Sequence, residues 1–152
     1  MMTNYSRRAL VGAALMLAGL ASTAVRAGAL DARAEAGDVT VTVKYSGKGT
    51  VDANHKIWVW LLTSPDIGPG AMPIAETSVD KNGAPASFVN IGAEQVWIAV
   101  AYDEGGGFAG SAPPPSGSPV SLYSGDGKTP TAVTPGPEGK VTVALTDAIR
   151  MQ

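Results

Sequence analysis

The chain has 152 residues, a formal net charge of −2 and no cysteine. Its length suits one domain rather than two. Without cysteine there can be no disulfides, iron–sulfur clusters or cysteine-ligated zinc, so the fold must be held by its apolar core alone.

The first 29 residues have the order of a secretory signal peptide. Arg7 and Arg8 precede an apolar run over residues 9–25, and small residues follow, ending at Ala27 and Ala29. Cleavage fits after either alanine, and an uncleaved membrane anchor is the alternative. The arginine pair also resembles the twin-arginine export signal, which leaves that route and the general secretory route both open. We expect an exported protein, periplasmic or secreted, with no membrane span in the mature chain.

Removal of the signal makes the charge more negative. It would take away Arg7, Arg8 and Arg26 but none of the 13 acids, leaving eight basic residues and a net charge near minus five. An acidic surface repels phosphate backbones, so nucleic acid is not expected as a partner.

The mature chain opens with a short lead-in and two strands. Residues 30–37 are alanine-rich and mixed in charge, which predicts a flexible segment. Residues 39–45 alternate between valine or tyrosine and polar residues, as in a half-buried strand. Residues 55–63 are apolar on both faces, which predicts a central strand covered on each side. Pro65, Pro69 and Pro73 then forbid regular structure.

The middle of the chain predicts three further strands. Residues 74–79 and 86–91 flank a turn with Asn82 and Gly83 at its tip. Residues 95–103 form the strongest element, because bulky residues on one face alternate with Trp97 and small alanines on the other.

Glycine- and proline-rich stretches dominate the last part, with short strands expected at residues 120–123, 131–134 and 140–146. The proline-rich segment 112–119 is expected to be a stiff surface connection. No stretch beyond the signal has the spacing of an amphipathic helix. The expected fold class is all-β: one immunoglobulin-like or prealbumin-like Greek-key sandwich of about seven strands over residues 38–152.

The order of elements resembles the prealbumin-like sandwiches, which include transthyretin-like and carboxypeptidase regulatory-like domains. The resemblance lies in the opening Val-x-Val-x-Val strand, a Gly-x-Val turn, the strand around Phe88, the aromatic strand that closes on Tyr102 and Asp103, and the final Val-x-Val-x-Leu strand. It implies a seven-stranded Greek-key sandwich and little about function, because such folds host many roles.

Enzymatic function is not expected. His55 is the only histidine, and no serine lies in a Gly-x-Ser-x-Gly elbow that would present a nucleophile. The transthyretin-like hydrolases carry several histidines and a Tyr-Arg-Gly-Ser ending, and this chain has neither. We therefore do not carry that activity over, and we expect no cofactor.

Two tryptophans allow a carbohydrate-binding hypothesis. Trp58 and Trp60 fall on one face of a strand, about 7 Å apart, as sugar-stacking aromatics do. Because the strand is apolar on both faces, burial of the two rings in a core is the favoured interpretation.

The loop after the strongest strand is the candidate ligand-binding surface, with Tyr102, Asp103, Glu104 and Phe108 as its residues. Asp103 and Glu104, together with Asp126 from a later turn, are candidate calcium ligands. Residues 105–107 are glycines and supply no side-chain oxygen, so we favour an acidic binding loop without metal.

The sequence thus predicts an exported, non-enzymatic β-sandwich module that binds a small ligand or an envelope protein. A structural or assembly element of the cell envelope is the first alternative. A carbohydrate-binding module that uses Trp58 and Trp60 is the second.

Overall fold

The computed structural model describes residues 36–66, 72–110 and 113–152. The predicted signal peptide, residues 30–35 of the lead-in, Pro69 and Ala112 lie outside the described residues. Those that are described form seven strands and no helix, which confirms the all-β class. None of their segments is a helix long and apolar enough to cross a membrane.

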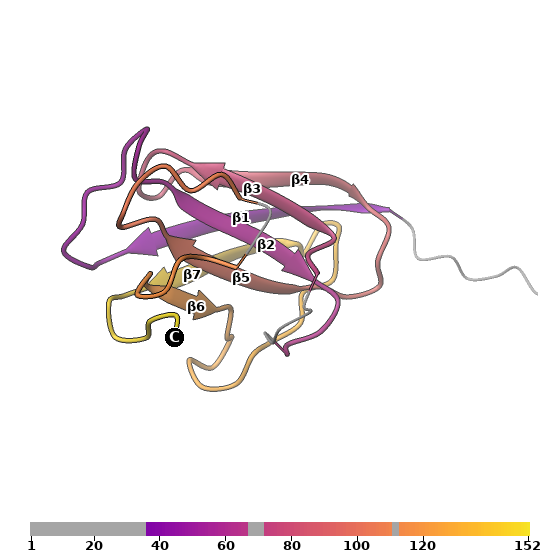
Figure 1. Cartoon of the computed structure of the whole chain (residues 1–152). Coiled ribbons are helices and arrows are strands. Elements are labelled where there is room, and N and C mark those ends of the chain that lie inside the picture. The colour runs from indigo at the N-terminus through magenta and orange to yellow at the C-terminus, as the bar shows by residue number, and fades with distance from the viewer. Residues whose placement is uncertain (1–35, 67–71, 111–112) are drawn as a thin grey trace, which may run out of the picture. The chain divides into compact units, whose positions relative to one another are not determined.

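Two sheets make up the fold (Figure 1). The strands are β1 (Gly37–Tyr45), β2 (Ile57–Leu62), β3 (Ala75–Val79), β4 (Pro85–Ile91), β5 (Trp97–Tyr102), β6 (Val120–Leu122) and β7 (Lys140–Leu145). One sheet has the order β4-β1-β7 and the other the order β3-β2-β5-β6. All pairs are antiparallel except β1 with β7, which is parallel.

A single apolar core lies between the two sheets. Alternation sends every second side chain inward, and the predicted inward residues of β1, β2 and β5 are buried. The largest fully buried side chains include Ile57, Leu61, Ile98 and Leu145. At one end of the core the rings of Tyr45 and Tyr102 stack with their centroids 4.5 Å apart.

A second apolar group, which we call the outer-face cluster, covers the opposite side of the four-stranded sheet. It contains Trp60, Leu62, Ala99 and Ala101, with Trp58, Trp97, Phe108, Val120 and Leu122 packed against them. The prediction of a central strand within residues 55–63 is confirmed, because β2 lies between β3 and β5. Both faces of β2 contact apolar residues, and on the outer face Trp58 is half-buried.

One predicted strand was wrong. Residues 131–134 form no strand, and only Val133 pairs, through an isolated bridge to Val96. Pro130 and Pro135 flank the segment and cannot donate to a ladder, so pairing does not extend past either end. The expected turn at Gly83 is present, with a positive φ of 79°.

Candidate functional site

The loop after β5 is shaped by the side chain of Asp103. Its Oδ1 accepts a hydrogen bond from the backbone N–H of Gly106 at 2.9 Å, and its Oδ2 accepts one from Phe108 at 2.8 Å. Asp103 is only 4% exposed. Both carboxylate oxygens thus hold the backbone of their own loop, as Asp does in turns.

Glycines let this loop fold back over the sheet. Gly106, Gly107 and Gly110 all have positive φ, a conformation that suits glycine. A Cβ added at Gly110 would lie 2.5 Å from the ring of Trp58, so only glycine allows this close approach. The Gly107 N–H also donates to the carbonyl of Asn54 at 3.2 Å, which ties the loop to the segment before β2.

The result of this geometry is that Phe108 covers the two tryptophans of β2. Its ring meets Trp58 edge-on at 5.3 Å between centroids and lies 6.2 Å from Trp60. Trp60 is 7% exposed, and its Nε1 donates to Glu76 Oε2 at 3.2 Å. Trp60 is therefore packed, as the favoured interpretation expects, whereas Trp58 is only half-buried. Both rings lie on the outer face of the four-stranded sheet and not in the core between the sheets.

A cleft of about 350 Å³ lies beside this loop. It is lined by Glu104, Gly105, Pro115, Ser116, Gly117, Ser118 and Arg150. Its walls therefore come from the loop after β5, the segment before β6 and the C-terminal tail. The lining holds one cation, one carboxylate, serine side chains and glycine backbone.

Arg150 organises the cleft. Its Nη1 donates to Glu104 Oε2 and to the carbonyl of Gly117, and its Nη2 lies 4.0 Å from Asp147 Oδ1. The hydrogen bond with Glu104 raises the pKa of the guanidinium, which keeps Arg150 charged. The tail is also fixed through its backbone, because Val120 donates to Ile149 and Met151 donates to Ser118.

A tyrosine and an aspartate anchor the same end of the sandwich. Tyr45 Oη donates to Asp147 Oδ1 at 2.7 Å, and the Lys48 N–H donates to Asp147 Oδ2 at 2.9 Å. These bonds lower the pKa of Asp147. Burial and the Asp147 hydrogen bond raise the pKa of Tyr45 to about 12. Tyr102 Oη donates to the Thr50 carbonyl at 3.0 Å.

His55 forms a local pair with an acid in its own turn. Its Nδ1 lies 3.1 Å from Asp52 Oδ1, and the side chain of His55 is 38% exposed. Asp52 also accepts bonds from the N–H groups of Asn54 and His55, which lower the pKa of its carboxyl. Within the described residues no serine or threonine hydroxyl is hydrogen-bonded to the His55 ring.

The four residues predicted to bind a ligand have different places in the structure. Tyr102 is 2% exposed and Asp103 is nearly as buried, so neither presents its side chain to a ligand here. Phe108 packs on the tryptophans. Glu104 alone lines the cleft.

The three candidate calcium ligands serve separate contacts. Asp103 holds its loop, Glu104 pairs with Arg150, and Asp126 Oδ1 accepts the N–H groups of Lys128 and Thr129. No group of three or more histidine, aspartate or glutamate side chains suited to a metal occurs in the part of the chain that the structure describes.

Sequence reasoning missed Arg150 and interpreted residues 115–118 only as part of a stiff surface connection. Arg150 lies 46 residues from Glu104 along the chain, so no local pattern connects them. The one available signal was a single arginine near the end of a chain with a net negative charge.

Comparison of the chain with protein-family models, with curated proteins and with solved structures found no match.

Proposed function

We propose that this protein is an exported, non-enzymatic binding module whose ligand occupies the cleft around Arg150 and Glu104. The observation that supports it best is the convergence of three chain segments on one cleft that holds a charged donor, a carboxylate and serine side chains. A concave site with a few convergent polar groups is the usual form of a small-molecule site.

The chemistry of the lining favours a small polar ligand with a carboxylate. Arg150 is the only cation in the lining, and guanidinium groups bind carboxylates in a planar, two-bond geometry. Its Nη1 contacts Glu104 at the surface, where an ion pair contributes little free energy. A ligand carboxylate can therefore replace Glu104 at modest cost.

Several features support a role without catalysis. His55 is the single histidine, and its ring pairs with Asp52 rather than with a hydroxyl nucleophile. The polar groups of the cleft are suited to holding a ligand, and none of them forms a nucleophile and base pair.

Export and the finer fold type belong to the same proposal. The arginine pair, the apolar run and the alanine exit support a cleaved signal. In an immunoglobulin constant domain the first strand pairs with the second. Here β1 pairs with β4 and β7, which favours the prealbumin-like type of Greek-key sandwich over the immunoglobulin-like one.

A thermal-shift screen tests the binding role. The purified protein is melted with amino acids, dicarboxylates and sugar acids, and a ligand of the cleft raises the melting temperature. Arg150→Ala is expected to lose that rise, whereas Lys128→Ala, an exposed cation outside the cleft, retains it. A rise that survives Arg150→Ala, or no rise with any compound, contradicts the proposal.

A structural or assembly role in the envelope is the second candidate. The observation in its favour is the outer edge of β7, which pairs with no other described strand. The carbohydrate role has less support, because Trp60 is buried and the ring of Phe108 lies against both Trp58 and Trp60.

A further inference from the structure

The two sheets of the sandwich differ in width. The β3-β2-β5-β6 sheet has four strands, and the β4-β1-β7 sheet has three. Strand β4 contacts β3, and β7 contacts both β5 and β6. These contacts place β4 opposite β3 and β7 opposite β5 and β6, and a fourth strand beside β7 would give both sheets four strands.

The outer edge of β7 has backbone groups suited to such a strand. Thr40 donates to the Gly139 carbonyl at 2.7 Å, and Ser46 donates to the Leu145 carbonyl at 3.0 Å. Odd-numbered residues of this segment thus face β1. Because the direction alternates along a strand, the N–H and C=O groups of Lys140, Thr142 and Ala144 point away from it.

The C-terminal tail does not cover this edge. After β7 the chain crosses to the other sheet, where Arg150 bridges to Pro119 at the edge of β6. The described residues that follow β7 are therefore already paired elsewhere, and the fourth strand must come from another segment.

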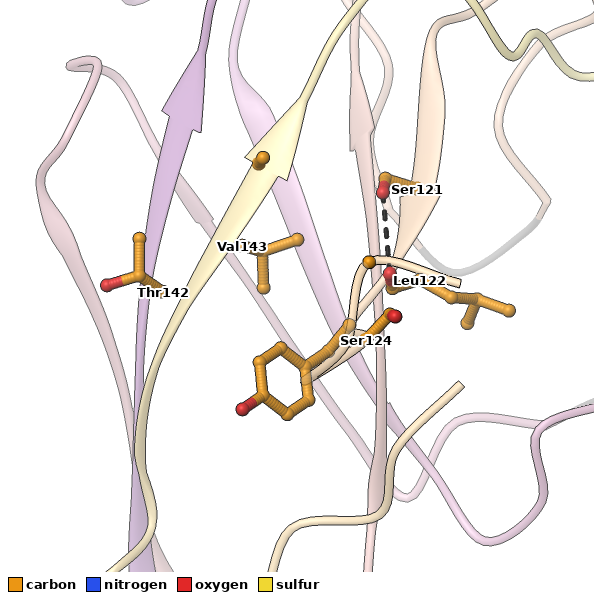
Figure 2. A pocket seen from close by; sticks show the side chains of 8 residues that line it. Ser121, Leu122, Ser124, Thr142 and Val143 are labelled. Carbon is orange, nitrogen blue, oxygen red and sulfur yellow. Dashed lines mark hydrogen bonds between the residues drawn. The ribbon is translucent and has the colours of Figure 1, made fainter. Parts of the chain in front are cut away.

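A groove lies where the inward side chains of an added strand would go (Figure 2). Its volume is about 170 Å³, and β6, β7 and the turn between them line it: Ser121, Leu122, Tyr123, Ser124, Gly127, Thr142, Val143 and Ala144. Figure 2 shows Ser121, Leu122 and Ser124 on one side and Thr142 and Val143 on the other. The lining carries no charge and the space is small, so the inward residues of the occupant must be small and uncharged.

The solvent face of the same edge is basic. The exposed residues of β1 and β7 there include Lys44 and Lys140, and neither paired segment, residues 40–45 or 140–145, contains an acid. An added strand with acids among its outward residues would complement this charge in a chain that is otherwise acidic.

The chain itself contains a segment with both properties. Residues 30–36 read Leu-Asp-Ala-Arg-Ala-Glu-Ala, so that the three alanines, with Leu30 at the end of the same face, alternate with Asp31, Arg33 and Glu35. In an extended conformation the alanines face one side and the charges the other. We propose that residues 30–36 of a second copy add as a strand to the outer edge of β7, with the alanines over the groove.

The geometry favours a second copy over the same chain. The segment leads into β1, which begins at residue 37, and β7 lies between β1 and the open edge. The turn at residues 135–139 also packs against the first residues of β1. To reach its own outer edge, the segment would cross two strand spacings, about 10 Å, and spend about three residues on the crossing. A segment from another copy makes no such crossing, so all of its residues can pair with β7. Because donor and acceptor surfaces differ, the contact is head-to-tail and can continue from copy to copy.

Sedimentation and nuclear magnetic resonance (NMR) test this contact on the protein as purified after export. We expect the average mass to rise with protein concentration, and a synthetic peptide of residues 30–36 to reverse the rise. The peptide should shift the amide signals of Lys140, Thr142 and Ala144 more than those of the β4 edge. The proposal is overturned if the protein stays monomeric and the peptide does not shift the β7 amide signals. It is also overturned if the protein stays monomeric because its own residues 30–36 already protect those amides.

Matched variants test each side of the contact. Thr142→Pro removes an outward N–H without touching a bond to β1 and should weaken association at least tenfold, whereas Thr142→Val should leave it unchanged. Ala34→Asp places a charge over the groove and should abolish association, whereas Ala34→Ser should retain it. If Thr142→Pro fails to fold, the Ala34 pair decides alone. Association that survives Ala34→Asp overturns the proposal.

Discussion

The interior core and the outer-face cluster lie on opposite sides of the same sheet, and they are built in different ways. The core comes from strands that alternate, so that one face of β1, β2, β5 and β7 fills it. The outer-face cluster uses the other face of β2 and β5, and a loop residue, Phe108, completes it. Alternation is sufficient for the first, whereas the second needs a loop of defined shape.

The difference extends to the residues that report on each region. All three tryptophans, Trp58, Trp60 and Trp97, belong to the outer-face cluster, while the buried tyrosines Tyr45 and Tyr102 belong to the core. Tryptophan emission therefore follows the outer-face cluster, and the alkaline titration of tyrosine follows the core. The two regions can be perturbed and observed separately.

The largest effect is expected from a charge in the core. Val100 is 1% exposed on the inner face of β5, so Val100→Asp buries an unpaired carboxylate. We expect a loss of more than about 4 kcal/mol in the free energy of unfolding and no folded protein. Val89→Asp is the matched control, because Val89 is 66% exposed and should fold normally. Circular dichroism melts of the two variants measure this, and similar melting temperatures would refute the assigned face of β5.

High pH should destabilise the end of the core that contains Tyr45. The folded-state pKa of Tyr45 is about 12, above the ordinary value of 10, because burial and Asp147 disfavour its anion. Its contribution is complete below pH 10 and is lost as the pH rises from 10 to 12, by roughly 2 to 3 kcal/mol. Urea unfolding at intervals from pH 9 to 12 measures this loss. Tyr45→Phe should show a shallower decline, and equal slopes in the two proteins would contradict the assignment.

Sequence reasoning succeeds where one physical rule governs a segment. Alternation alone predicts that Val39, Val41 and Val43 point inward, and all three are fully buried. Seven of the eight expected strands are present, with ends that differ by at most two residues from those observed. Residues 131–134 are the exception, because β-branched residues between prolines look like a strand although only Val133 pairs.

The candidate site is less predictable for two reasons. Asp103 and Glu104 look alike in sequence, yet Asp103 turns inward to hold backbone N–H groups and Glu104 turns outward to Arg150. Which way each carboxylate points depends on the path of the glycine loop, and no periodicity encodes that path. The cleft also joins segments far apart in the chain, Glu104 and Arg150 among them, through tail pairing that the sequence pattern does not indicate.

Loss of the Asp103 carboxylate should loosen the outer-face cluster and spare the core. Asp103→Ala removes two hydrogen bonds to backbone N–H groups, and hydrogen bonds to charged groups are each worth about 1.5 to 3 kcal/mol. We expect a net loss of about 1 to 3 kcal/mol, since water reaches part of the freed loop. Tryptophan emission should shift to the red because Phe108 no longer covers Trp58. Asp66→Ala, at an exposed loop position, is the control with unchanged emission. Emission that stays the same in Asp103→Ala would mean that Phe108 holds its place without the carboxylate.

The smallest effect is expected on the solvent face of the three-stranded sheet. Lys44 is exposed on β1, pairs in register with Ala144, and forms no ion pair in the described part of the chain. Surface changes of this kind alter stability by less than about 0.5 kcal/mol, so Lys44→Glu should unfold at nearly the wild-type urea concentration. The measurement must be made at low protein concentration, where one copy cannot stabilise another. Under that condition the core and the outer-face cluster are both intact and only the charge of the face has changed. A loss above about 1 kcal/mol in the free energy of unfolding would show that this face is covered and not open to water. The protein would then have a third contact region besides the core and the outer-face cluster.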